Sequence, residues 1–212
     1  MKKINIGCGF YQIIPGWLNY DYNKKYKKEF VKFHIKKILN FFSLYHHYNW
    51  KNQKQFYEET INYDMRKRIP HEDDSVDFIY ISHTLEHFTQ DEGALFLNEA
   101  FRVLKKNGVI RIVVPDLELF IKAYEENDFL FLKKLKEHYE LFIPCKEPID
   151  ALNLIFRVAG HEYIYSYRKL KNLCLQTGFH SVEKKEYGQS NIPDIPQWEI
   201  FRVDNLCVEA VK

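Results

Sequence analysis

Glycines, carboxylates and histidines recur immediately after short apolar runs in the first half of the chain. In chain order these residues are Gly7, Cys8 and Gly9, then Asp21 with Tyr22, then Asp64 with Met65, then the run from His83 to His87, and then Asp116. Glycines let a backbone approach a ligand closely, and carboxylates accept hydrogen bonds from hydroxyl and amino groups. The pattern therefore predicts a ligand site in which glycine backbone and two aspartates contact the bound molecule.

Three histidines are candidates for acid–base chemistry. They are His83, His87 and His161, and Glu86 and Asp116 are candidates for orienting them. An imidazole titrates near neutral pH, so it suits removal of a proton from a hydroxyl group. Each of the three also fits a purely structural role, as a hydrogen-bonded or surface residue.

The sequence does not predict a metal site. His34, His46 and His47 lie in a lysine-rich segment without a nearby cysteine or carboxylate set, so a zinc site is not expected there. The cysteines are Cys8, Cys145, Cys174 and Cys207. They are far apart and form no C-x-x-C pair, so we expect buried thiols and a reducing, cytoplasmic location.

The elements that must position these residues read as an α/β fold. Strands are expected over residues 2–6, 17–20, 61–64, 76–82 and 109–114, and two further strands over 181–187 and 206–211. Helices are expected over 92–106, 117–141, 151–157 and 167–177. The first strands are continuous apolar runs, which is typical of a parallel sheet covered on both faces, where ligands bind outside the carboxyl ends of the strands.

Two connections depart from a regular alternation. Residues 10–20 are too few for a full crossover helix, so the first crossover helix is expected to be reduced or absent. Residues 22–60 are expected to form a helical insertion, whose lysines oppose an apolar face. That insertion is either a helix packed on the sheet or a lid or docking surface for an acidic partner, and its apolar face completes either the monomer core or a homodimer. Residues 117–160 are expected to form a helical addition on the substrate side.

Length and charge set broad limits. The chain has 212 residues, with 31 Lys and Arg against 29 Asp and Glu, so its formal net charge is +2. This length suits a single domain over residues 1–212, and the charge argues neither for nor against nucleic acid. No apolar run reaches the length of a membrane span, and the chain starts directly with strand residues, so no span and no secretory signal are expected.

Several motifs together resemble those of class I S-adenosylmethionine-dependent methyltransferases. They are Asn-Ile-Gly-Cys-Gly at 5–9, Gly16 to Asp21, Asp64-Met65 with Ile69-Pro70, Ser75 to Ile79 with His83-Thr84-Leu85-Glu86-His87, and Leu104 to Gly108. The chain is most similar to the small type 11 branch associated with polysaccharide or lipopolysaccharide biosynthesis.

The resemblance implies a fold and a cofactor. The fold would be a three-layer Rossmann-like sheet, mostly parallel with an antiparallel last strand, and the cofactor would be S-adenosylmethionine. Gly7, Cys8 and Gly9 would contact its methionine part, and Asp21, with Tyr22 beside it, would bind the ribose hydroxyls. Asp64 would meet the adenine amino group and the Met65 N–H an adenine ring nitrogen, while His83 would stand between cofactor and acceptor.

The resemblance also implies methyl transfer to a small-molecule or carbohydrate acceptor, with a role in surface polysaccharide biosynthesis. One alternative is an RNA or protein methyltransferase that uses the basic insertion. It is disfavoured because His83-Thr84-Leu85 stands where amino-methylating nucleic-acid enzymes carry Asn/Asp-Pro-Pro-aromatic. A second alternative is a catalytically inactive binding subunit, since the usual Gly-x-Gly-x-Gly loop is shortened to Gly7-Cys8-Gly9.

Overall fold

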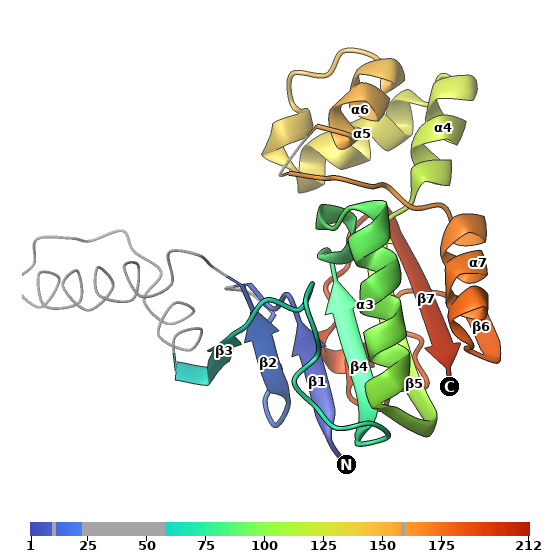
Figure 1. Cartoon of the computed structure of the whole chain (residues 1–212). Helices are drawn as coiled ribbons and strands as arrows, with labels where there is room; N and C mark the ends of the chain where they lie inside the picture. The colour runs from blue at the N-terminus through green and yellow to red at the C-terminus, as the bar shows by residue number, and fades with distance from the viewer. Residues whose placement is uncertain (10–11, 23–57, 158–159) are drawn as a thin grey trace, which may run out of the picture.

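A seven-stranded sheet forms the centre of the molecule (Figure 1). The computed structural model describes residues 1–9, 12–22, 58–157 and 160–212. The strands are β1 (Lys3–Ile6), β2 (Leu18–Asp21), β3 (Thr60–Asn62), β4 (Val76–Ser82), β5 (Leu104–Pro115), β6 (Ser181–Lys185) and β7 (Asn205–Val211). Their order across the sheet is β3-β2-β1-β4-β5-β7-β6. The five neighbouring strands β3, β2, β1, β4 and β5 pair in parallel, whereas β7 runs antiparallel to both of its neighbours, β5 and β6. This confirms the expected mostly parallel sheet with an antiparallel last strand.

The helices of the described residues accompany this sheet. They are α3 (Gln90–Val103), α4 (Leu117–Glu125), α5 (Phe129–His138), α6 (Pro148–Ile155), α7 (Tyr167–Thr177) and α8 (Ile195–Trp198), with 3-10 turns η1 (Leu85–His87) and η2 (Glu140–Phe142). The last long helix has the capping expected from its sequence. Ser166 accepts a hydrogen bond from the Lys169 N–H at its start, and Gly178 ends it in a left-handed conformation.

Alternate residues of the central strands serve two cores. Ile79 and Ile81 of β4 pack in one cluster with α3 and α7, while Tyr80 between them packs in a second cluster with Trp17 and Ile195. Side chains of a strand alternate between the two faces of a sheet, so the clusters lie on opposite faces. Both faces are therefore covered, the first by α3 and α7 and the second, among the described residues, by α8 and the segments around it.

The connection from β1 to β2 is short, as the sequence predicted. Its described residues, 7–9 and 12–17, contain no helix. The buried Asn19 side chain stabilises the connection, because its Oδ1 accepts from the Ile14 N–H at 3.0 Å and from Asn5 Nδ2 at 2.9 Å. The apolar and basic faces expected for 22–60 fall mainly on residues 23–57, outside the described part of the chain.

A buried ion network joins the second face to the segment before β7. Arg111 of β5 is fully buried and contacts Glu199 through Nε and Nη2, at 2.7 and 2.8 Å. Its Nη1 also donates to Glu209 of β7 at 3.1 Å. This pairing explains why one arginine interrupts the otherwise apolar run 109–114 of β5.

Helices α4, α5 and α6 form a separate group beyond the carboxyl ends of the parallel strands (Figure 1). They enclose a core of their own, which includes Phe120, Leu135 and Ile155. The single helix expected over 117–141 is wrong: Asn127 takes a positive φ of 52°, and Asp128 caps a new helix by accepting from the Phe131 N–H. Similarly, the helix expected over 92–106 ends at Val103, because the next residues already pair with β4.

In the part of the chain that the structure describes, no helix combines the length and apolar character needed to cross a bilayer.

Candidate active site

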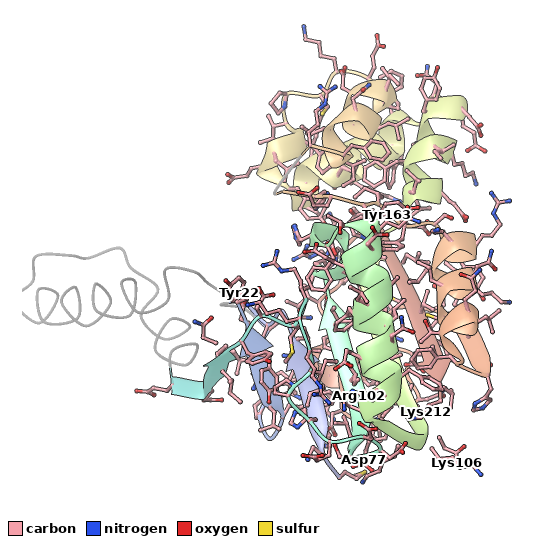
Figure 2. All side chains as sticks on the ribbon, viewed as in Figure 1. Tyr22, Asp77, Arg102, Lys106, Tyr163 and Lys212 are labelled. Carbon is pink, nitrogen blue, oxygen red and sulfur yellow. The ribbon has the colours of Figure 1, made fainter. Side chains whose placement is uncertain are left out.

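A pocket of about 560 Å³ opens at the carboxyl ends of β1, β2 and β4. Its walls come from four segments that are distant in sequence: 6–9, 20–22, 63–66 and 83–88. Figure 2 shows Tyr22 at this end of the sheet, whereas Asp77, Arg102 and Lys212 lie at the opposite end. The pocket is within the size range of small-molecule sites and lies where open α/β sheets bind ligands.

The glycine turn after β1 forms one wall. Gly7 has a φ of +72°, and a Cβ at this position would lie 1.7 Å from Thr84 Oγ1. Gly9 has a φ of +50°, and no heavy atom of the described residues beyond its chain neighbours lies within 4 Å of the place where its Cβ would lie, so its backbone borders open space in the pocket. A glycine is therefore needed at the two positions for different reasons: at position 7 it makes room for the Thr84 side chain, and at position 9 it leaves room for a ligand.

Asp21 stands at the end of β2 and is held by the same turn. Its Oδ2 accepts from the Gly9 N–H at 2.8 Å, and its Oδ1 accepts from the Tyr22 N–H at 2.6 Å. Each carboxylate oxygen keeps a lone pair, so both can still accept from ribose hydroxyls. Burial raises the pKa of Asp21, although the two N–H groups act in the opposite direction.

The segment after β3 lines the pocket with a bidentate ion pair between Asp64 and Arg66. Arg66 contacts both oxygens of Asp64, at 2.9 and 2.8 Å, and its guanidinium lies 5.4 Å from the centre of the Tyr22 ring. The hydrogen bonds from Arg66 lower the pKa of Asp64, so the carboxylate is ionised at neutral pH. Its expected contact with an adenine amino group would have to use the lone pairs that Arg66 leaves. Met65 also lines the pocket, and its side chain is buried.

Cys8 lies away from the pocket. Its thiol is buried and lies 3.5 Å from Thr60 Oγ1, and burial raises its pKa to about 12. The thiol therefore stays protonated at neutral pH and packs the turn after β1 against Thr60 at the start of β3. The cofactor contact predicted for Cys8 can involve only its backbone.

His83 lines the opposite wall of the pocket in a fixed orientation. Its φ is +47°, an uncommon conformation for a non-glycine residue, and its N–H donates to the Val113 carbonyl at 2.8 Å. Asn205 Nδ2 donates to the Ile200 carbonyl, which turns the Asn205 Oδ1 toward His83 Nε2 at 2.8 Å. Because this oxygen only accepts, Nε2 carries the proton and Nδ1 of a neutral His83 carries the lone pair.

The other two candidate histidines lie next to each other. His87 lines the pocket, and the centre of its ring lies 5.1 Å from that of His161. His161 is half-buried, which lowers its pKa and favours the neutral ring. Glu86 lies beside this pair and beside His83, with Oε1 at 3.4 Å from His83 Nδ1. The structure thus brings together all three histidines and one of their two predicted orienting groups.

Asp116 has a different place. It caps α4 by accepting from the Glu118 N–H, and its other oxygen accepts from Lys184 Nζ at 3.0 Å. These contacts fix the start of the helical addition rather than a histidine.

Sequence reasoning missed several residues of the site. They are Tyr20, Tyr63, Arg66, Thr84 and Phe88 in the pocket wall, and Asn205 behind His83. Thr84 stands inside the His83–His87 motif, and its importance follows only from its approach to Gly7. Asn205 is distant in sequence, and no local signal connects it with His83.

The fold is that of class I S-adenosylmethionine-dependent methyltransferases. It is similar to a SAM-dependent methyltransferase from Archaeoglobus fulgidus, with a TM-score of 0.53 and 14% identity over 100% of this chain and 86% of that one. It is also similar to an S-adenosylmethionine-dependent methyltransferase from Mesorhizobium loti, with a TM-score of 0.51 and 14% identity over 100% of this chain and 90% of that one. A third similar structure is PigF with SAH, with a TM-score of 0.54 and 10% identity over 100% of this chain and 50% of that one. These identities are low, so the structures define the fold.

A sequence family adds to this likeness. Residues 41–112, about a third of the chain, match the Methyltransf_11 family, described as a methyltransferase domain. A search of curated proteins finds no significant match. Together, the family match and the solved structures support S-adenosylmethionine as the cofactor.

Proposed function

We propose that this protein transfers a methyl group from S-adenosylmethionine to a hydroxyl group of a small-molecule or carbohydrate acceptor. The observation that carries the proposal is the pocket itself. One wall offers glycine backbone and a half-buried aspartate at the end of β2, and the other offers histidines at the end of β4. The first wall fits an adenosine and its amino-acid tail, and the second fits a reacting hydroxyl.

Gly9 and Asp21 carry the fit to the cofactor. The space in front of Gly9 would be filled by any side chain, and Asp21 has acceptor lone pairs directed by two backbone N–H groups. Tyr22, Tyr63 and Met65 supply apolar surface near the aspartate for a flat base. The cofactor brings the activated methyl group, so the chain has to align the acceptor and exclude water.

His83 is the best placed base for a hydroxyl acceptor. It lines the pocket, and Asn205 fixes its tautomer so that Nδ1 can take a proton. Loss of this base should lower turnover by about 10²- to 10⁴-fold. Replacement by alanine should leave the affinity for S-adenosylmethionine nearly unchanged, whereas equal losses of turnover and binding would assign His83 a structural role.

The class of acceptor rests on weaker support. Polysaccharide biosynthesis is supported by the resemblance of the sequence motifs to the type 11 branch. The cytoplasmic location is supported by the four cysteines, which are unpaired and buried. The lysine-rich insertion that would serve an RNA or protein acceptor lies outside the described residues, so we place that alternative second.

Calorimetric titration with S-adenosylmethionine and S-adenosylhomocysteine tests the proposal. Wild-type protein should bind both, and Asp21→Ala should bind neither measurably, because the ribose loses its charged acceptor. Asp91→Ala is the matched control, since Asp91 is an exposed aspartate in the first turn of α3. Absence of binding to folded wild-type protein would reject the enzyme and favour the inactive binding subunit.

A further inference from the structure

Glu86, His87 and His161 form a compact group beside the pocket. One oxygen or nitrogen atom of each lies within 4.8 Å of the corresponding atoms of the other two. Glu86 is only 1% exposed, and the two histidines are half-buried. A carboxylate and two imidazoles are all donors that bind divalent metals.

The fold holds the group together through the backbone. The carbonyl of Glu86, in η1, accepts hydrogen bonds from the N–H groups of Glu162 and Tyr163, at 2.8 and 3.1 Å. This pins the segment that leaves the helical addition onto η1, and Figure 2 shows Tyr163 at that junction. Because His161 directly precedes Glu162, the same contact brings its ring to His87.

Each of the two imidazoles has one nitrogen fixed by a carbonyl oxygen. His161 Nδ1 lies 2.7 Å from the Ile155 oxygen, and His87 Nδ1 lies 3.3 Å from the Gly160 oxygen. A carbonyl accepts but cannot donate, so the proton sits on Nδ1 and the lone pair of each neutral ring sits on Nε2. Metal-binding histidines commonly have this arrangement, in which a second group holds the opposite ring nitrogen.

The carboxylate has an oxygen that the protein does not satisfy. Glu86 Oε2 is buried and has no hydrogen-bond partner among the described residues. Its other oxygen faces the lone pair of His83 at 3.4 Å. A buried carboxylate oxygen without a donor is costly, and a cation would supply the missing partner of Oε2.

We propose that Glu86, His87 and His161 bind one divalent transition-metal cation, of the zinc, cobalt, manganese or iron(II) type. Three protein ligands leave coordination positions open. His87 also lines the pocket, so these positions adjoin the histidine wall. On the basis of the proposed function, they would take oxygen atoms of the methyl acceptor, which makes acceptors with neighbouring hydroxyl groups the favoured class.

Titration of metal-free protein with Co²⁺, followed by visible absorption and calorimetry, tests this site. We expect one cobalt ion per chain. Loss of a group behind a metal ligand typically weakens binding about 10–100-fold, so His161→Ala and Glu86→Gln, which remove ligands, should weaken it by at least about 100-fold. His138→Ala is the matched control, because His138 is also fixed through Nδ1 by a carbonyl, that of Lys134, but is exposed at the end of α5.

Two outcomes would overturn the proposal: no cobalt binding by folded wild-type protein, or binding that neither His161→Ala nor Glu86→Gln weakens. Circular dichroism of each variant confirms folding. The cobalt titration needs no S-adenosylmethionine, so its result is independent of the cofactor titration above. Cobalt binding without cofactor binding would keep this site and reject the proposed function, and the reverse result would reject this site alone.

Discussion

In the glycine turn that forms one wall of the pocket, Gly7 is expected to tolerate substitution least. Its φ is +72°, and an added Cβ would overlap Thr84 Oγ1 at 1.7 Å. Gly7→Ala should therefore lower the free energy of unfolding by more than the roughly 1–2 kcal/mol that a left-handed backbone costs an alanine. Urea denaturation measures the loss.

Gly188 separates the two causes. It has the same φ of +72°, but in the part of the chain that the structure describes no atom beyond its chain neighbours lies within 4 Å of the place where a Cβ would lie, so Gly188→Ala carries only the backbone cost. In a double-mutant cycle, Thr84→Gly should destabilise the Gly7→Ala protein less than it destabilises the wild type, because it removes the overlap while its own cost, which includes the lost hydrogen bond to the Ser82 carbonyl, is the same in both. Equal losses for Gly7→Ala and Gly188→Ala would show that Thr84 does not restrict this turn.

The affinity for the cofactor should depend on pH through Asp21. Burial raises the pKa of this carboxyl group, and only its ionised form accepts hydrogen bonds from two ribose hydroxyls. As the pH falls, affinity for S-adenosylhomocysteine should therefore decline at a higher pH than the ordinary aspartate value of about 3.9 would give. Titrations from pH 7 to about pH 4 check this, and a decline that Asp21→Asn reproduces unchanged would assign it to another group.

The raised pKa of Asp21 also predicts that the ionised carboxylate lowers the stability of the cofactor-free protein while it favours cofactor binding. A native pKa above the unfolded value means that protonation of Asp21 favours the native state at low pH, and that this stabilisation is lost as the pH rises through the native pKa. At neutral pH the ionised carboxylate is thus a cost to the cofactor-free protein. Asp21→Asn should raise its melting temperature slightly while weakening S-adenosylmethionine binding about 10–100-fold, since charged hydrogen bonds contribute about 1.5–3 kcal/mol. A lower melting temperature would show that the N–H contacts outweigh burial.

At the scale of elements, the ion pairs of Arg111 are expected to stabilise the packing of the segment before β7 against the sheet. Glu199→Ala leaves a buried guanidinium without its bidentate partner, which should lower the free energy of unfolding by about 3–5 kcal/mol. Chemical denaturation provides the measurement. Glu183→Ala is the control, because its ion pair with Lys185 is exposed and should contribute about 0–1 kcal/mol. Similar losses for the two variants would contradict a structural role for the network.

Most elements could be predicted from the sequence because their apolar runs and caps are local signals. The boundaries that failed lie where pairing overrides local pattern. Asn107-Gly108 resembles a helix stop, yet residues from Leu104 onward belong to β5 because Leu104 pairs with Val76 of β4. By contrast, the break between α4 and α5 has a local signal that the single helix expected over 117–141 overlooked: it falls in the polar run Glu125-Glu126-Asn127-Asp128, where Asn127 takes a positive φ and Asp128 caps α5.

The candidate site was predictable only in part. Each residue that follows a strand could be placed at one edge of the sheet, because parallel strands end together. Contacts between distant segments could not be predicted, such as Thr84 against Gly7 or Asn205 behind His83. The absence of metal-ligand spacing in the sequence also did not exclude the group of Glu86, His87 and His161. This group forms through a backbone contact between η1 and residues 162–163, which are distant in sequence.

At the scale of the whole molecule, the cofactor should tie separate segments together. The pocket joins the turn after β1 to the ends of β2 and β4 and to the segment after β3. A ligand at about 100 times its dissociation constant stabilises the native state by about 2.7 kcal/mol. For a chain of this length, S-adenosylmethionine should therefore raise the melting temperature by about 5–10 °C. Scanning calorimetry measures the shift, and an equal shift in Asp21→Ala would place the ligand elsewhere.

The most direct test of the proposed cofactor site is a crystal structure of the protein with S-adenosylhomocysteine. We predict that the ligand fills the pocket, with both ribose hydroxyls within hydrogen-bond distance of Asp21, its amino-acid tail against Gly7 and Gly9, and its sulfur directed toward His83. A ligand bound elsewhere, or a ribose that does not contact Asp21, would contradict this prediction.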